Sequence, residues 1–231
     1  MKYLNVVEGK FISRPNRFIA NVLINEKEHI CHVKNTGRCR ELLVRNAVVY
    51  LEKCRSSSRK TSHSLITVQK GERFVNIDSQ APNKVFLEGI KNGIIRLNGL
   101  HPVTFLKPEK TFGESRFDFY MESGNKRAFV EVKGVTLEED GIAKFPDAPT
   151  ERGLKHINEL VRAKNEGYDA WIVFVIQMDK IKYFKPNNDT HPAFGKALRY
   201  ARDNGVNILA CECSVGSDII KLNGVLRGIV L

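Results

Sequence analysis

The sequence predicts an α/β fold in two parts, a small N-terminal β-barrel followed by a larger domain with a central mixed sheet. Short strand-like segments fill residues 1–81, the tripeptide Ala81-Pro82-Asn83 interrupts the chain, and residues 82–231 mix strand and helix patterns. The chain has 231 residues, 42% of them hydrophobic, which is enough for one large domain or two small ones. We therefore expect one domain over residues 1–81 and a second over residues 82–231.

The first domain is expected to be a barrel of short strands. The segments with alternating or β-branched patterns are residues 17–24, 30–33, 47–51, 64–68 and 74–77. Five short strands within about 80 residues suit an OB-like β-barrel, a fold that binds nucleic acid. The breaks between these strands are basic, so they supply our candidate nucleic-acid-binding residues: Arg14, Arg17, Arg38, Arg59 and Lys60.

The second domain is expected to surround a sheet with helices. Helical spacing of apolar residues predicts helices over residues 84–91, 150–166 and 192–204, the last two followed by glycine. Strands are expected at residues 94–97, 103–106, 116–121, 128–132, 171–176 and 208–211. The apolar run through residues 171–176 is typical of a central strand that is covered on both faces. The order of these elements predicts an α/β domain.

The charge of the chain is concentrated in its first third. Residues 1–85 carry 16 basic and 7 acidic side chains, a net charge of +9 out of +11 for the whole sequence. Such a one-sided basic segment favours nucleic acid as the partner, because contacts with phosphates release condensed counterions. No apolar run approaches the roughly 20 residues that cross a bilayer, and the N-terminus lacks a signal-peptide pattern. We expect a cytoplasmic protein without a membrane partner.

The five cysteines do not predict a disulfide framework or a zinc site. Their number is odd, and no two of them have the spacing of a Cys-x-x-Cys motif. We expect reduced thiols, most of them buried in the core.

Two carboxylates and a lysine are expected to meet on one hairpin. Residues 115–120 and 129–133 both alternate, so the two phenylalanines beside Asp118 should share a face and Asp118 should point to the opposite one. In the second strand, Glu131 and Lys133 should point together away from the valines between and before them. Gathering these charges is costly unless something binds them.

Two interpretations of this cluster remain open. Carboxylate oxygens are suitable ligands for Mg²⁺ or Mn²⁺, and such an ion beside a lysine can promote hydrolysis of a phosphodiester. The alternative is an exposed hairpin with ordinary cross-strand ion pairs, which contribute only tenths of a kcal/mol.

Longer blocks of sequence stand around the Asp…Glu-x-Lys pattern. These blocks are Asn16-Arg17-Phe18, Asn35-Thr36-Gly37-Arg38, Arg59-Lys60-Thr61, Pro82-Asn83, Ser115-Arg116-Phe117-Asp118-Phe119, Glu131-Val132-Lys133-Gly134-Val135-Thr136-Leu137, the run of residues 145–156 (FPDAPTERGLKH) and Glu159-Leu160. The Asp…Glu-x-Lys pattern resembles the PD-(D/E)xK nuclease superfamily, and the blocks together resemble the sugar fermentation stimulation protein A family. The resemblance implies an N-terminal OB domain and a restriction-endonuclease-like (PD-(D/E)xK) α/β domain with a central mixed sheet. It also implies DNA binding and a link to sugar-utilisation genes.

The resemblance also implies roles for single residues. Asp118 and Glu131 would hold the metal and Lys133 would be the catalytic lysine. Glu88 stands where the superfamily often places a supporting metal ligand.

The helix at residues 150–166 carries two further candidates. Arg152 and His156 are four residues apart and share a face, so they could serve as a charge clamp and a proton carrier near the scissile phosphate. The alternative is a solvated helix face. We expect a Mg²⁺- or Mn²⁺-dependent nuclease acting on DNA, with a non-cleaving DNA-binding regulator of sugar-utilisation genes and an RNA nuclease as alternatives. The oligomeric state is open, a homodimer being one alternative.

Overall fold

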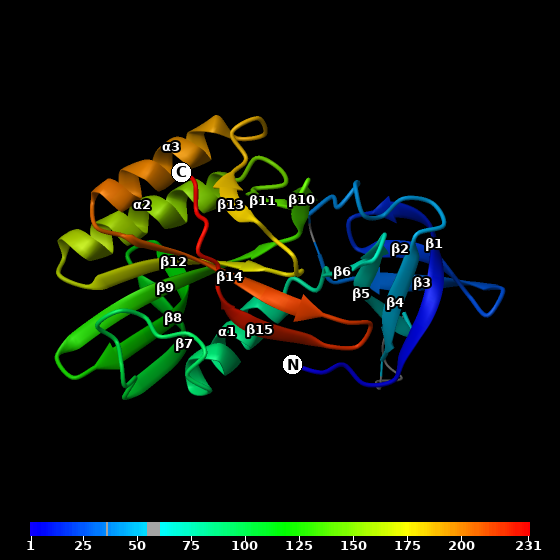
Figure 1. Cartoon of the computed structure of the whole chain (residues 1–231), viewed down its shortest axis with the longest axis horizontal. Coiled ribbons are helices and arrows are strands. Elements are labelled where there is room, and N and C mark those ends of the chain that lie inside the picture. The colour runs from blue at the N-terminus through cyan, green and yellow to red at the C-terminus, as the bar shows by residue number, and fades with distance from the viewer. Residues whose placement is uncertain (36, 55–60) are drawn as a thin grey trace.

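The computed structural model describes residues 1–35, 37–54 and 61–231. A barrel and an α/β domain lie side by side in it, with the barrel on the right of Figure 1. Two of the predicted nucleic-acid-binding residues, Arg59 and Lys60, lie outside the described residues.

Five strands close the barrel. The strands of this part are β1 (Val6–Asn16), β2 (Ile19–Ile24), β3 (Lys27–Val33), β4 (Val48–Lys53), β5 (His63–Lys70) and β6 (Arg73–Asn76). Their order is β3-β2-β1-β4-β5-β6, and an additional pairing of β3 with β5 closes the ring. Side chains of β2 alternate between buried and partly exposed, as expected when one face lines a barrel core. The predicted OB-like barrel is confirmed.

The composition of the ring differs from the prediction in two strands. β1 was not expected, because its charged residues and Gly9 hide the strand pattern and its pairing with β2 shifts register twice, after Phe11 and after Ser13. The predicted strand at residues 74–77 corresponds to β6, which pairs only with β5 and extends the sheet outside the ring.

The second domain is built on a mixed six-stranded sheet. The strands are β7 (Phe105–Phe112), β8 (Ser115–Ser123), β9 (Lys126–Val135), β12 (Asp169–Ile176), β14 (Asn207–Val215) and β15 (Ile220–Val225). Their order is β15-β14-β12-β9-β8-β7. The central strand β12 runs parallel to both β9 and β14, while the other pairs are antiparallel. A small separate sheet contains β10 (Leu137–Glu139), β11 (Ile142–Phe145) and β13 (Tyr183–Pro186).

Helices cover both faces of the large sheet. α2 (Glu151–Asn165) and α3 (Pro192–Asp203) share one apolar core with the sheet, and this core continues into the barrel. α1 (Ala81–Lys91) packs on the opposite face with a second core. The strand expected at residues 94–97 is absent, because the chain turns back after α1 through Gly93, whose φ is +69°. Ile95 and Leu97 in this turn are nevertheless buried in the second core.

Polar contacts and an ion cluster join the two domains. Gln177, after β12, donates from Nε2 to Asn76 Oδ1 at 2.9 Å and accepts at its carbonyl from the Asn76 N–H at 3.0 Å. Glu138 on β10 is buried and pairs with Lys70 and Arg73 of the barrel at 2.8 and 2.7 Å. The domain interface is therefore fixed by directional contacts as well as by the shared core.

The start of the chain lies against the second domain. Lys2 forms a bridge with Ile219, and the Tyr3 N–H donates to the Asp218 carbonyl at 2.8 Å. Tyr3 is buried in the second core. Residues 2–3 therefore attach to the far domain, while the Tyr3 hydroxyl also accepts from Asn76 Nδ2 of the barrel at 3.0 Å.

All five cysteines lie within the described residues, where none of them forms a disulfide, and four are buried. No helix within the described ranges is long and apolar enough to cross a membrane.

Candidate active site and basic pocket

Glu131 forms the centre of the candidate active site. It lies on β9, between β8 and β12, and only 3% of it is exposed. Its Oε1 accepts a hydrogen bond from Lys133 Nζ and lies 2.5 Å from His156 Nδ1. Its Oε2 is buried and has no hydrogen-bond partner among the described residues. One carboxylate oxygen is thus held in place by two side chains, while the hydrogen-bonding capacity of the other is unsatisfied among the described residues.

Asp118 lies where β8 stops pairing with β9. The pairing of the two strands ends at Phe119 and Val130. Beyond this point a side chain replaces the backbone as the acceptor, since Asp118 Oδ2 accepts from the Val132 N–H at 2.8 Å. Its Oδ1 accepts from Asn83 Nδ2 of α1, also at 2.8 Å. These two hydrogen bonds fix the carboxylate against β9. Asn83 was not a candidate residue, although the Pro82-Asn83 block at the start of α1 was a visible signal.

The two phenylalanines beside Asp118 do not share a face, contrary to the expected alternation. Phe119 packs on Phe86 of α1, with ring centroids 5.4 Å apart, whereas Phe117 lies 6.0 Å from the His156 ring in the other core. Regular pairing of β7 with β8 skips Asp118 and Glu109, and Glu109 has a left-handed φ of +54°. This irregularity lets Asp118 leave the pleat and meet β9.

The charges of the site act on each other. Burial raises the pKa of Asp118, and the nearby Glu131 carboxylate raises it further. Burial acts to raise the pKa of Glu131 as well, but the Lys133 ammonium and the His156 hydrogen bond outweigh it and hold that pKa below its ordinary value. Of the two groups, Glu131 is therefore the one that ionises more readily. A cation near both groups would favour ionisation of Asp118 as well.

His156 and Arg152 extend the site along α2. Thr150 caps this helix by accepting from the Gly153 N–H at 3.0 Å, which fixes where the helix begins. Arg152 Nε lies 3.4 Å from His156 Nε2 as a donor, so His156 carries its proton on Nδ1 and donates to Glu131. His156 is buried, and Arg152 is exposed. The helix face is therefore not fully solvated, and its histidine joins the candidate site.

Glu88 does not join this group. Its half-exposed carboxylate accepts from the Met1 amine at 2.7 Å, and none of its contacts in the described parts of the chain reaches Asp118 or Glu131. Across those same parts, no three His, Cys, Asp or Glu side chains gather as a set of metal ligands.

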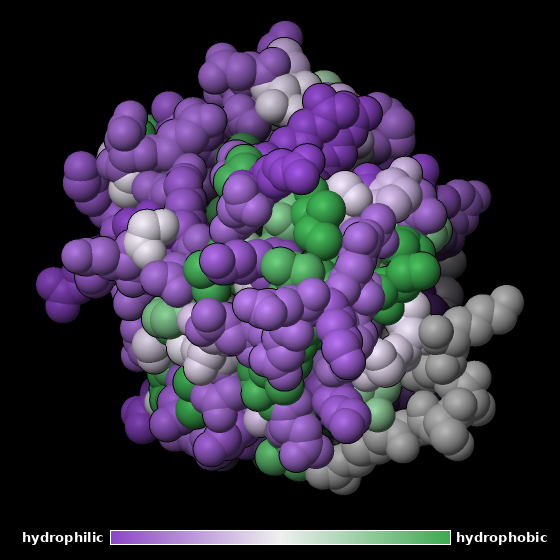
Figure 2. Space-filling model, turned by 90° about the vertical axis from the view of Figure 1, so that its right-hand side faces the viewer, coloured by the Kyte–Doolittle hydropathy of each residue, from purple (hydrophilic) through white to green (hydrophobic). Residues whose placement is uncertain are grey.

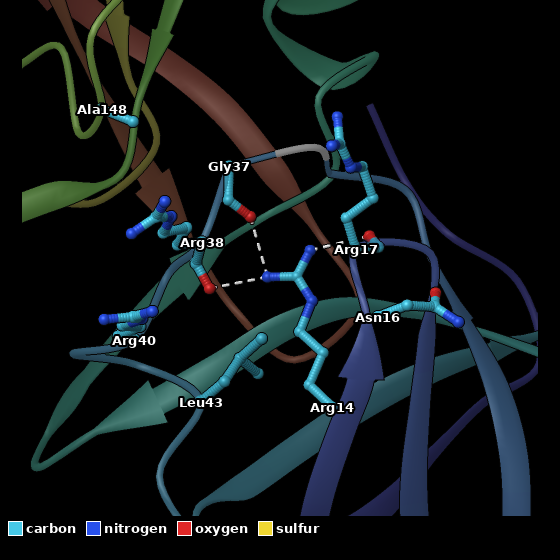
Figure 3. A pocket seen from close by; sticks show the side chains of 8 residues that line it. All are labelled: Arg14, Asn16, Arg17, Gly37, Arg38, Arg40, Leu43 and Ala148. Atoms are coloured by element: carbon cyan, nitrogen blue, oxygen red, sulfur yellow. Dashed lines mark hydrogen bonds between the residues drawn. The ribbon is translucent and has the colours of Figure 1, made fainter.

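Three of the predicted barrel arginines, Arg14, Arg17 and Arg38, line a pocket of about 480 Å³. Arg14, at its centre in Figure 3, donates from Nη1 to the Gly37 and Arg38 carbonyls at 2.8 and 2.6 Å. From Nη2 it donates to the Arg17 and Asn35 carbonyls at 2.8 and 2.7 Å. Arg14 therefore ties two loops together through both terminal nitrogens, while its buried Nε has no hydrogen-bond partner among the described residues.

Three exposed arginines remain around this pocket. Arg17 and Arg38 were predicted, while Arg40 was not named as a candidate. The pocket is lined by Arg14, Asn16, Arg17, Gly37, Arg38, Arg40, Leu43 and Ala148. Ala148 comes from the second domain, so the pocket lies at the domain junction. Figure 2 views the molecule from the barrel end, where the surface is mainly hydrophilic with small hydrophobic patches.

Comparisons with known proteins agree with this architecture. Residues 12–77 match the family model of the SfsA N-terminal OB domain, and residues 80–218 match that of the sugar fermentation stimulation protein RE domain. Sugar fermentation stimulation protein homologs from Clostridium beijerinckii and Desulfitobacterium hafniense Y51 are each 56% identical, with 96% of this chain covered in both cases and 96% and 95% of those proteins.

A solved structure also matches the whole chain. The structure of Pyrococcus furiosus SfsA in complex with Ca²⁺ superposes with a TM-score of 0.89 at 29% sequence identity, covering 100% of this chain and 98% of that one. Both domains, their order and nearly the full length are shared with these proteins. The chain belongs to the sugar fermentation stimulation protein family.

Proposed function

We propose that this protein is a metal-dependent nuclease that hydrolyses phosphodiester bonds in nucleic acid, with DNA as the favoured substrate. The observation that carries the proposal is the buried Glu131 carboxylate, of which Oε1 is held by Lys133 and His156 and Oε2 has no partner among the described residues. An unpartnered buried carboxylate oxygen is costly, and a bound cation would remove that cost.

The residues present fit Mg²⁺ or Mn²⁺. Mg²⁺ keeps several water ligands and binds proteins through one or two carboxylates, so Asp118 and Glu131 suffice without a third side chain. The Ca²⁺ named for the Pyrococcus furiosus relative is also a hard cation that prefers oxygen ligands, which supports this assignment. A bound dication would lower the pKa of a water and stabilise negative charge on the phosphorus.

The chain's own groups would position the reactants. The Lys133 ammonium donates one hydrogen bond to Glu131 and has no second partner in the part of the chain that the structure describes. Its two other N–H groups can therefore donate to the attacking water or to a phosphate oxygen. His156 fixes the rotamer of Glu131, and the exposed Arg152 lies beside it to bind a phosphate. Val132 N–H and Asn83 orient Asp118.

The basic barrel would hold the substrate. Residues 1–85 carry most of the net positive charge, and three exposed arginines surround the pocket at the domain junction. Phosphate contacts of this kind give affinity without sequence selection. A nucleic-acid substrate also favours a cytoplasmic location for this protein.

The test is cleavage of labelled single-stranded DNA, duplex DNA and RNA in Mg²⁺, Mn²⁺ or EDTA. Wild type is compared with Glu131→Gln, which keeps the shape of the side chain but removes its charge. Glu122→Gln, on β8, serves as the matched control because Glu122 accepts from Tyr120 Oη and does not contact Glu131 or Lys133 in the described residues.

We expect metal-dependent cleavage by wild type and Glu122→Gln, and none by Glu131→Gln. Preferred cleavage of RNA would replace DNA as the substrate. Binding without cleavage of any substrate would overturn the proposal and favour a non-cleaving regulator of sugar-utilisation genes.

A further inference from the structure

We propose that the basic pocket at the domain junction holds an unpaired nucleotide of the substrate strand, with its phosphate on Arg38 and Arg40. This inference deepens the proposed function and rests on it for the identity of the ligand. It names the substrate as a nucleic acid with a single-stranded segment beside the cleaved bond.

The pocket is organised before any ligand binds. A single guanidinium, that of Arg14, is hydrogen-bonded to the backbone of both loops that carry the exposed arginines, at the Arg17 and Arg38 carbonyls. Two further carbonyls, of Asn35 and Gly37, complete its partners. Because these loops are already fixed, binding an anion there costs less conformational entropy than ordering free loops would.

Its size and lining fit one nucleotide. The volume of about 480 Å³ is within the range of pockets for small ligands. In Figure 3, Arg38 and Arg40 lie on the same side of Gly37, where they provide charge for a phosphate and flat surfaces on which a base can stack. Leu43 and Ala148 provide apolar contacts. A base within a duplex is paired and stacked, so an unpaired base is the one that can enter such a pocket.

A second, smaller pocket lies beside the basic pocket. Gly37 lines both, and the second one, of about 170 Å³, is also lined by Gly134, the residue after Lys133. From the second domain, Ala148 lines the basic pocket and its neighbour Asp147 lines the smaller one. The basic pocket therefore lies near the end of β9, on the same junction between the two domains.

The test measures binding by fluorescence anisotropy in EDTA, so that cleavage plays no part. Labelled single-stranded DNA, the same sequence as a duplex, single-stranded RNA and unlabelled deoxynucleoside monophosphate are the probes. The double variant Arg38→Gln/Arg40→Gln is compared with Lys10→Gln/Lys27→Gln. The control removes the same charge at the opposite end of β2, where these lysines pair with Leu23 and Ile24.

We expect wild type to bind single strands more tightly than the duplex. The arginine variant should bind single strands about tenfold or more weakly than wild type. The slope of log K against log salt concentration should become less negative by about 1.4, that is, by about 0.7 for each of the two lost phosphate contacts. The lysine control should change both quantities less. Equal losses in the two variants, tighter binding of the duplex, or competition by the monophosphate as effective as that by the strand would each overturn the proposal.

Failure here is distinguishable from failure of the proposed nuclease. A wild-type protein that binds single strands through Arg38 and Arg40 but cleaves none of them with Mg²⁺ refutes the nuclease and leaves the pocket assignment intact. Cleavage that persists unchanged in Arg38→Gln/Arg40→Gln at subsaturating single strand refutes the pocket and leaves the nuclease intact.

Discussion

Replacing Glu138 with glutamine is expected to destabilise the domain junction by about 2–3 kcal/mol at neutral pH. Glu138 is 6% exposed, and its Oε2 pairs with Lys70 and Arg73 of the barrel. Its Oε1 accepts from the Gly141 N–H at 2.6 Å. Glutamine keeps an acceptor for Gly141 but removes the charge that the two barrel cations face.

The magnitude follows from the pKa of Glu138. Burial acts to raise it, but hydrogen bonds from Lys70, the Gly141 N–H and Arg73 prevail and lower it from 4.5 to about 2. At 1.36 kcal/mol per pKa unit this corresponds to about 3.4 kcal/mol, which solvent screening at the partly exposed Lys70 reduces to about 2–3 kcal/mol. Because the folded-state pKa is the lower one, the stabilisation is complete above the ordinary pKa and is lost as pH falls toward 2.

Urea unfolding between pH 7 and pH 3 provides the assay. The difference in unfolding free energy between wild type and Glu138→Gln should fall to about half its neutral value near pH 3. Glu139→Gln is the matched control, since Glu139 is 59% exposed and pairs with Lys144 at the surface, where such a pair contributes about 0–1 kcal/mol. A difference for Glu138→Gln that is independent of pH, or no larger than that of the control, would refute the reasoning.

Three further predictions concern the candidate active site. Lys133→Ala should abolish cleavage while Mn²⁺ affinity by calorimetry stays near wild type, and Asp118→Ala should lose both; wild-type activity in Lys133→Ala would contradict the roles given. His156→Leu leaves Glu131 without its imidazole partner and should cost about 1–3 kcal/mol in urea unfolding at pH 7, whereas an unchanged midpoint would mean that the hydrogen bond does not stabilise the fold. Gly134→Ala would place a Cβ 2.5–2.7 Å from the side chains of Gln177 and Pro82 and should lower the free energy of unfolding by about 1–3 kcal/mol. An unchanged midpoint in urea unfolding would contradict this prediction.

The sequence predicted the helices and the central strand of the second domain, but it missed the short or edge strands β10, β11, β13 and β15 there and β1 in the barrel. Strand β12 and helices α2 and α3 follow from long apolar patterns and glycine stops, and these signals survive in any packing. β1 was missed because a strand with one face in water, two register shifts and several charges has little periodicity to detect. β6 was assigned to the ring because closure depends on the distant β3–β5 pairing, which no local pattern encodes.

The candidate site shows the same limit. Glu131 and Lys133 follow the alternation of β9, so their shared face was predictable. The position of Asp118 depends on an irregularity opposite Glu109, and its contact with Asn83 crosses from one element to another. The alternation of apolar and polar residues predicts which face of a sheet each side chain occupies. It does not indicate the residue at which a strand stops pairing with its neighbour.

The attachment of the first residues to the far domain has a consequence for the order of events during synthesis. Lys2 and Tyr3 are synthesised long before the backbone they contact at Asp218 and Ile219. The barrel strands contact one another within the first part of the chain and can assemble while translation continues. Residues 2 and 3 thus reach their native position only after translation has passed residue 219.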